Sequence, residues 1–224
     1  MSEIKLIVTS DGSHSLLNEA LNETYHSVHG AIQESQHVFI NNGLRYFLDS
    51  STSANSVSIF EVGFGTGLNA LLTAKAMEIT KASSSYIAVE AFPVSEGLWT
   101  SLNYTTVLGH EDIFARLHRC LWETENYITP RLVLTKRQTT LQEIELEPQS
   151  FDVVYFDAFP PNKQPELWTI DMLRKVIDAM KVNCVFVTYC AKGQLKRDLK
   201  ELGLRVETLA GPPGKKEMVR AVKT

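Results

Sequence analysis

Several features that would assign this chain of 224 residues to a particular class of protein are missing from its sequence. No apolar run approaches the roughly 20 residues that a membrane-spanning helix requires. The N-terminus lacks the basic start and apolar segment of a secretion signal. The three cysteines are scattered, with no Cys-x-x-Cys pair and no histidine at metal-ligand spacing. We therefore expect a cytoplasmic protein with reduced thiols, no bound metal and no contact with a membrane.

The composition is that of an ordinary globular chain, with 44% hydrophobic and 21% charged residues, and it suffices for one domain with a real core. The net charge of −4 argues against a nucleic-acid binder, but the charges are unevenly placed. Residues 181–224 carry ten Lys and Arg against four Asp and Glu, whereas the rest of the chain is acidic. This basic segment is compatible with a phosphate-binding face. On charge alone, a solvated helix and strand are the favoured interpretation.

From residue 57 onward, short apolar runs alternate with stretches of helical periodicity. This alternation predicts an α/β fold, in which a mostly parallel sheet is covered by helices on both faces. Seven strands are expected, at 57–62, 85–90, 131–135, 151–157, 183–189, 204–207 and 217–222. Later helices are expected at about 94–107, 110–123, 165–180 and 193–202.

Before residue 57 the pattern is less regular. The expected elements are a strand over 4–9, a turn over 10–13, a helix over about 15–22, and an extended piece, a turn and a short helix over 38–48. Segment 25–35 is rich in histidine, tyrosine and acidic residues, so it either lines a site or lies at the surface with satisfied histidines. The small polar residues 50–56 predict a linker. We therefore divide the chain into an N-terminal extension, 1–56, and a core, 57–224.

The most informative stretch surrounds the end of the first core strand. Glu61 precedes a Gly-x-Gly-x-Gly turn at 63–67, and an apolar helix begins at about Leu68. Such glycines let the backbone turn sharply and approach a ligand, and the start of a helix offers unpaired N–H groups. An acid at this point would repel the pyrophosphate of a dinucleotide, but it suits an amine-bearing ligand such as S-adenosylmethionine. The alternative is a glycine-rich loop that only turns the chain.

Two more acids follow expected strands. In open α/β sheets, ligands bind beyond the carboxyl ends of the strands. Glu90 lies about 20 residues after the glycine turn, the offset at which an acid commonly accepts hydrogen bonds from ribose hydroxyls. Asp157 ends an apolar strand and precedes a proline-stiffened loop, where a carboxylate can accept a proton from an amine. Taken singly, Glu90 is equally typical of the surface and Asp157 of a loop or helix cap.

Basic residues near the C-terminus form a further group. They are Lys192, Lys196, Arg197, Lys215 and Lys216, to which Arg131, Lys136 and Arg137 are added as possible members. Because lysine and arginine contact nucleic-acid phosphates, these residues predict a phosphate-binding patch.

Two blocks of the sequence, 60–69 and 156–168, resemble a known family. Segments 11–13, 25–34 and 211–218 share the resemblance, so it spans nearly the whole chain. The chain resembles the methyltransferase domain of the bifunctional tRNA 5-methylaminomethyl-2-thiouridine biosynthesis protein. This resemblance implies a Rossmann-like class I methyltransferase fold with a seven-stranded, mostly parallel sheet, and S-adenosylmethionine as the methyl donor.

The resemblance also implies a reaction. It is methylation of the 5-aminomethyl group of wobble uridine in tRNA, with the anticodon stem-loop as the bound partner. The family's FAD-dependent oxidase domain has no counterpart among the motifs of this sequence, so no FAD is expected and a separate enzyme is expected to supply the aminomethyl intermediate. One alternative is a methyltransferase acting on a small molecule or a protein. Another is a nucleotide-binding module without catalysis.

Individual roles are implied by position in the family. The residues expected to bind the donor are Glu61 at its amine, Gly63, Gly65 and Gly67 at its methionine part, Glu90 at its ribose, Asn69, and Tyr25 and Glu34 as closing residues. Gln138 replaces the Asp that often contacts adenine in this fold. Asp157 is the expected catalytic residue and faces the acceptor amine. The expected substrate and tRNA contacts are Phe159, Tyr189, Lys192, Arg197, Lys215 and Lys216, and Phe64 and Trp168 are further candidates for stacking on the base.

Overall fold

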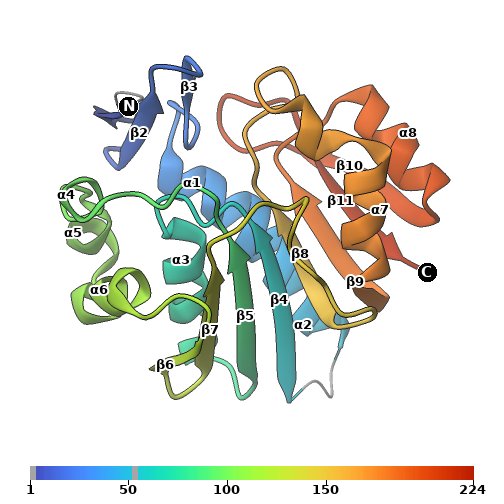
Figure 1. Ribbon diagram of the computed structural model, residues 1–224, viewed down its shortest axis with the longest axis horizontal. Helices are drawn as coiled ribbons and strands as arrows, with labels where there is room; N and C mark the ends of the chain where they lie inside the picture. The colour runs from blue at the N-terminus through green and yellow to red at the C-terminus, as the bar shows by residue number, and fades with distance from the viewer. Residues whose placement is uncertain (1–3, 52–54) are drawn as a thin grey trace.

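A mixed sheet of eight strands dominates the computed structural model, which describes residues 4–51 and 55–224 (Figure 1). The strand order is β10-β11-β9-β8-β4-β5-β7-β6. The strands are β4 (Ser56–Val62), β5 (Ser83–Val89), β6 (Glu125–Thr129), β7 (Leu132–Arg137), β8 (Phe151–Phe156), β9 (Met180–Thr188), β10 (Leu204–Ala210) and β11 (Glu217–Lys223). The five central strands, from β7 to β9, are mutually parallel. All seven expected strands are present, which confirms the predicted class of fold.

The eighth strand of this sheet, β6, was not expected. It pairs antiparallel with β7 at one edge, across a short connection that contains Pro130. Within β6 only Ile128 is buried, and its neighbours are polar or exposed. An edge strand with one buried side chain has almost no period-2 signal, so pairing with β7 rather than local pattern creates it.

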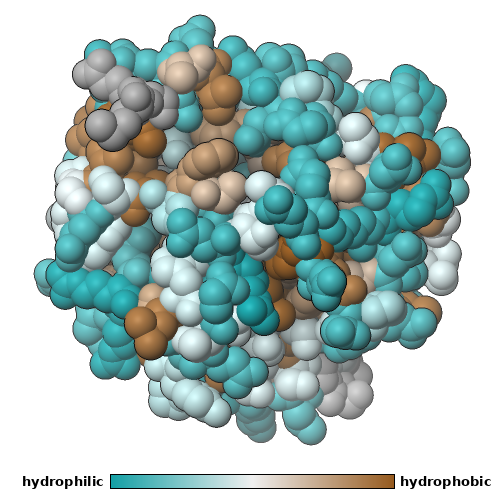
Figure 2. Space-filling model, in the orientation of Figure 1, coloured by the Kyte–Doolittle hydropathy of each residue, from teal (hydrophilic) through white to brown (hydrophobic). Residues whose placement is uncertain are grey.

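Helices cover both faces of the sheet. One face carries α3 (Leu68–Glu78) and α6 (Glu111–Arg119), and the other carries α7 (Ile170–Asp178) and α8 (Gly193–Glu201). Alternate residues of β4 serve the two layers: Ile59 packs in the first hydrophobic cluster and Phe60 in the second. Glu61 therefore points to the same side as Ile59, toward α3. On the face shown in Figure 2 the surface is largely hydrophilic, and its apolar residues form several separate groups.

Two expected helices are shorter than the sequence indicates. The stretch 94–107 contains α4 (Glu96–Trp99) and α5 (Tyr104–Leu108), which are separate. The stretch 165–180 begins with a 3₁₀ turn, Pro165–Trp168, before α7. Thr169 separates the two and caps α7, because its side chain accepts a hydrogen bond from the Met172 N–H.

The helix expected over 15–22 is wrong. An antiparallel sheet of β1 (Ile4–Val8), β2 (His14–Asn18) and β3 (Glu23–Thr24) is found there. The expected turn between the first two strands is present, and Gly12 adopts a φ of +81° within it. A short apolar run such as Leu16-Leu17 suits a helix or a strand equally, and pairing with β1 decides for the strand.

The extended piece and turn expected over 38–48 are also wrong. One unbroken helical segment runs through α1 (Ala31–Ser35), a ten-residue stretch of wider π-type turns (Gln36–Arg45) and α2 (Tyr46–Ser50). Gly43 does not make a turn but lets the helix approach the sheet, since an added Cβ would lie 2.9 Å from Val187 Cγ2. Residues 52–54 of the expected linker lie outside the described residues. Across residues 4–51 and 55–224, no helix is long and apolar enough to cross a membrane.

Candidate methyl-donor and acceptor site

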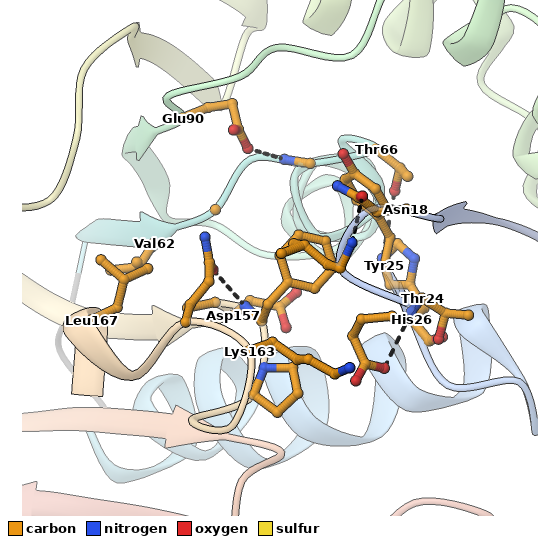
Figure 3. A pocket seen from close by; sticks show the side chains of 18 of the residues that line it. Asn18, Thr24, Tyr25, His26, Val62, Thr66, Glu90, Asp157, Lys163 and Leu167 are labelled. Carbon is orange, nitrogen blue, oxygen red and sulfur yellow. Dashed lines mark hydrogen bonds between the residues drawn. The ribbon is translucent and has the colours of Figure 1, made fainter. Parts of the chain in front are cut away.

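A cavity of about 1160 Å³ lies beyond the carboxyl ends of the central strands (Figure 3). Its walls come from the glycine turn after β4, the residues that follow β5, β7 and β8, and the N-terminal segment that includes β3. Figure 3 shows Glu90, Asp157 and the adjacent pair Tyr25 and His26, from three separate parts of the chain, gathered around it. The cavity lies beside β4. From β4 the chain continues to β5 and β7 on one side, and it returns to β8 and β9 on the other side. That is the usual ligand position in such sheets.

Glu90 braces the glycine turn from its neighbouring strand. Its carboxylate accepts hydrogen bonds from the backbone N–H groups of Gly65 and Phe92, each at 2.9 Å. Burial raises the pKa of Glu90, and these backbone hydrogen bonds oppose the rise. Each carboxylate oxygen has a second lone pair, so Glu90 can still accept a hydroxyl proton from a ligand.

Glu61 lies beneath the cavity rather than at its wall. Its side chain is 0% exposed, and its Oε1 accepts a hydrogen bond of 2.9 Å from Asn69 Nδ2. Burial raises the pKa of Glu61 well above its usual value, and the charge of Asp157 adds to the rise. The expectation that Glu61 faces the ligand directly is therefore not met, because β4 points this residue toward α3.

Asn69 joins the two acids. The same Nδ2 lies 2.8 Å from Asp157 Oδ2, so one amide donates to a carboxylate of β4 and to one that follows β8. Asn69 Oδ1 is a buried side-chain oxygen without a hydrogen-bond partner among the described residues. Glu61, in contrast, interacts with the buried hydroxyl of Tyr86. A buried acceptor without a donor costs free energy. An amine-bearing cation would satisfy Asn69 Oδ1, whereas a phosphate would not.

Asp157 stands at the cavity wall with unusual proton affinity. Burial, together with the negative charge of Glu34, raises its pKa to about 7, against the lowering effects of the Asn69 hydrogen bond and of Lys215. Its backbone carbonyl lies against Gly63, where an added Cβ would approach that oxygen to 2.9 Å. Because Gly63 also has a φ of +90°, only glycine fits this close approach.

The N-terminal extension forms one wall of the cavity. Tyr25 packs edge-on against Phe159, with ring centroids 5.1 Å apart, and burial raises the pKa of its phenol to about 12. Glu34 accepts a 2.6 Å hydrogen bond from the Ser27 N–H and forms an ion pair with Lys215. Segment 25–35 could have formed a site wall or a surface segment, and the structure supports the wall.

Other predicted site residues lie away from the cavity wall. Of the described residues that line it, none is Gly67, Gln138, Lys192, Arg197 or Lys216. Gln138 instead donates its backbone N–H to Glu123 Oε1 at 2.7 Å, and residues 139–143 form the wall. β7 ends at Arg137, so the chain reaches the cavity one residue later than expected.

Lys136 does not belong to a surface patch. Its side chain is buried, and its Nζ donates to the His118 carbonyl oxygen at 2.7 Å. The ammonium also lies 4.6 Å from the centroid of the Trp122 ring. Burial lowers its pKa. The suggested addition of Lys136 to the phosphate-binding patch is therefore wrong.

Several residues that line the cavity were not predicted from the sequence. Residues 17, 18 and 20–24, expected mainly as a helix, line the cavity as part of the β2–β3 hairpin. Phe92 lines the rim although its residue surface is 79% exposed, and its position two residues after Glu90 was a usable signal. His26 is buried in the wall, where burial lowers its pKa to about 4, so it is neutral near pH 7. No pattern in the surrounding sequence distinguishes this buried histidine from His29, which is exposed.

Comparisons with known proteins bear on the family and the fold. The model of a family described as S-adenosyl-L-methionine-dependent methyltransferase matches residues 109–224. The chain is 27% identical over 218 residues to the tRNA 5-methylaminomethyl-2-thiouridine biosynthesis bifunctional protein MnmC of Nitrosospira multiformis, covering 92% of this chain and 35% of that protein. For the protein of the same name from Burkholderia multivorans, identity is 31% over 232 residues, covering 96% and 34%.

The chain thus spans about a third of the length of the curated relatives that it matches. The crystal structure of MNMC2 from Aquifex aeolicus superposes with a TM-score of 0.82 at 26% identity, covering 100% of this chain and 71% of that one. The expected fold is confirmed, with one strand more in the main sheet than predicted. This chain belongs to the S-adenosyl-L-methionine-dependent methyltransferase family.

Proposed function

We propose that this enzyme methylates the 5-aminomethyl group of a wobble uridine in tRNA, forming the 5-methylaminomethyl group. The names of the relatives, which align with nearly the whole chain, support this acceptor. The observation that carries the proposal is the bridge formed by Asn69, which sets Asp157 beside the acid of the glycine turn. An acidic, acceptor-rich wall suits a nucleophilic nitrogen next to a cationic donor.

The donor side of the cavity fits S-adenosylmethionine, which supplies an electrophilic methyl group when bound. Gly63 and Gly65 leave room for its methionine part, and the free oxygen of Asn69 suits its amine. Glu90 is placed to accept from its ribose hydroxyls. Phe92 and residues 139–143 are the available walls for adenine, in place of Gln138.

The acceptor side needs a group that removes a proton, because an alkylamine in water is mostly protonated near neutral pH. With a pKa of about 7, Asp157 is half ionised at neutral pH and can accept that proton or relay it. Phe159 and Tyr25 offer aromatic surfaces on which an unpaired wobble base can stack. Trp168 is less suited, since it is buried and its indole N–H donates to the Phe159 carbonyl at 2.8 Å.

The rest of the chain fits this assignment. The extension 1–56 would close the donor site, as Tyr25 already packs over Gly65. Lys192 and Arg197, at the start of α8 and within it, and Lys216, in the loop between β10 and β11, are exposed. We expect them to contact the anticodon stem-loop. A separate enzyme would supply the aminomethyl group, and the reaction would take place in the cytoplasm.

The test uses the purified chain, S-adenosylmethionine and tRNA that carries 5-aminomethyluridine derivatives, with nucleoside mass spectrometry as the readout. We expect one added methyl group on the wobble nucleoside. Donor binding is measured separately by calorimetry. Tight donor binding with no methylated nucleoside would overturn the tRNA assignment and favour a small-molecule or protein acceptor.

A further inference from the structure

Glu34 and Lys215, which are distant in the sequence, form an ion pair in the wall of the cavity. Glu34 belongs to α1, and Lys215 to the loop between β10 and β11. Their side chains are 6% and 31% exposed, respectively, so water screens this pair only in part. The pair therefore ties the N-terminal extension to the last hairpin of the core beside the acceptor side.

Lys215 makes a second contact that leads to Asp157. Its ammonium lies 3.8 Å from the centroid of the Tyr189 ring. The Tyr189 hydroxyl in turn donates a 2.7 Å hydrogen bond to the carbonyl oxygen of Ala158, the residue after Asp157. Lys215 thus supports the loop that carries Asp157.

The loop holding Lys215 is seated against the extension. Gly214, with a φ of +82°, faces the ring of His29, where an added Cβ would lie 1.9 Å from Cδ2. Within the loop, the Lys215 N–H donates to the Pro212 carbonyl at 2.9 Å, and Gly211 donates to Lys216 at 3.1 Å. The His29 ring and the backbone hydrogen bonds of the loop thus fix where the Lys215 ammonium is presented.

Several titratable groups face Asp157. They are Glu61 from β4, Tyr86 from β5, Tyr189 after β9, Glu34 from α1 and Lys215 from the β10–β11 loop. Among these groups, Glu34 supplies the negative charge that raises the pKa of Asp157, and Lys215 supplies the positive charge that lowers it. Removing either charge leaves the other uncompensated beside Asp157.

We infer that Glu34 and Lys215 are a positioning pair that holds the acceptor wall and balances the charge around Asp157, and that Lys215 is not a contact to the RNA backbone. This inference rests on the proposed function, because it concerns the residue that faces the acceptor. It replaces the tRNA-binding role predicted for Lys215. To reach a phosphate, the Lys215 ammonium would have to leave both Glu34 and the Tyr189 ring. Lys216, its exposed neighbour, has no such obstacle.

The experiment titrates the Asp157 carboxyl carbon by NMR in protein labelled with ¹³C-aspartate, the signal being assigned with Asp157→Asn. It needs no turnover, so its failure is distinguishable from failure of the proposed function. Loss of positive charge in Lys215→Met should raise the midpoint by about one pH unit, and loss of negative charge in Glu34→Gln should lower it by a similar amount. Lys215→Arg keeps the charge and should restore the wild-type midpoint.

Lys216→Met is the matched control, because it removes the same charge from the adjacent position. It should leave the midpoint unchanged and weaken tRNA binding, whereas Lys215→Met should shift the midpoint and leave the salt dependence of tRNA binding unchanged. The inference is overturned if the Asp157 midpoint is unmoved in folded Lys215→Met. If that variant does not fold, an unmoved midpoint in Glu34→Gln overturns it equally.

Discussion

Asn69 Nδ2 lies 2.8 Å from Asp157 Oδ2, and this contact links the helix that follows the glycine turn to the acid that follows β8. The donated hydrogen bond favours the ionised form of Asp157, while the rest of the amide, Oδ1, remains available to a ligand. Asn69 of α3 can thus influence both the protonation of Asp157 and the binding of the proposed donor.

Replacing Asn69 by Ala should affect both the protonation of Asp157 and the binding of the donor. Without the amide, Asp157 loses a donor that lowers its pKa, so the acidic limb of the rate profile should move to higher pH. Donor affinity should fall by about tenfold, the effect of one lost hydrogen bond to a charged group. Calorimetry of S-adenosylmethionine binding and the pH profile of kcat/KM measure the two effects, and unchanged donor affinity would show that Asn69 does not contact the donor.

Asp157→Asn should retain donor binding and lose turnover. A positioned general base contributes about 10²- to 10⁴-fold, so a loss of that order in kcat is expected. In the wild-type enzyme, the ionised fraction of Asp157, and with it the rate, should rise as the pH increases through about 7. Single-turnover methylation of tRNA at several pH values checks both points. Wild-type kcat in the variant would remove Asp157 from the mechanism.

The same substitution should stabilise the fold at alkaline pH. Since the pKa of Asp157 rises from 3.8 in the unfolded chain to about 7 on folding, the folded state binds more protons between these values. Stability from this group is therefore present below about pH 4 and is lost as the pH rises through 7. Relative to wild type, Asp157→Asn should melt a few degrees higher at pH 8 and nearly equally at pH 4. Equal melting shifts at both pH values would contradict this.

Glu90→Gln should lower the affinity for the donor strongly while lowering the stability of the fold only slightly. The amide oxygen can still accept one backbone N–H, so the melting temperature should fall by only a few degrees. Donor affinity should fall by about tenfold or more, because a neutral amide accepts hydroxyl protons less strongly than a carboxylate. S-adenosylhomocysteine, which has the same ribose, should lose affinity by the same factor. Unequal losses would place Glu90 away from the ribose.

Lys192→Gln should weaken tRNA binding without changing donor binding. Lys192 is exposed at the start of α8, and each lost phosphate contact reduces the slope of log K against log salt by about one. Filter binding over a range of salt concentrations measures this slope. Lys200→Gln, on the same helix and also exposed, is the comparison for a lysine without an assigned contact. An equal effect of both would indicate a diffuse charge effect and not a specific contact.

Local pattern alone determined the core of this protein. Strands β4, β5 and β8 have apolar runs that end at Glu61, Glu90 and Asp157, and parallel strands necessarily bring such ends to one edge of the sheet. The glycine turn needs only backbone freedom, which is encoded residue by residue. These signals are short-range, so they could be recognised without the structure.

Only the tertiary structure decided the rest. The β2–β3 hairpin and β6 depend on pairing with partners that local periodicity does not reveal. The burial of Glu61 beneath Asn69, and of Lys136 beneath Trp122, follows from which face of a strand meets a helix or ring. The ion pair of Glu34 with Lys215 joins α1 to the loop between β10 and β11. Contacts between residues so far apart in the sequence arise from packing, and the sequence spacing does not predict them.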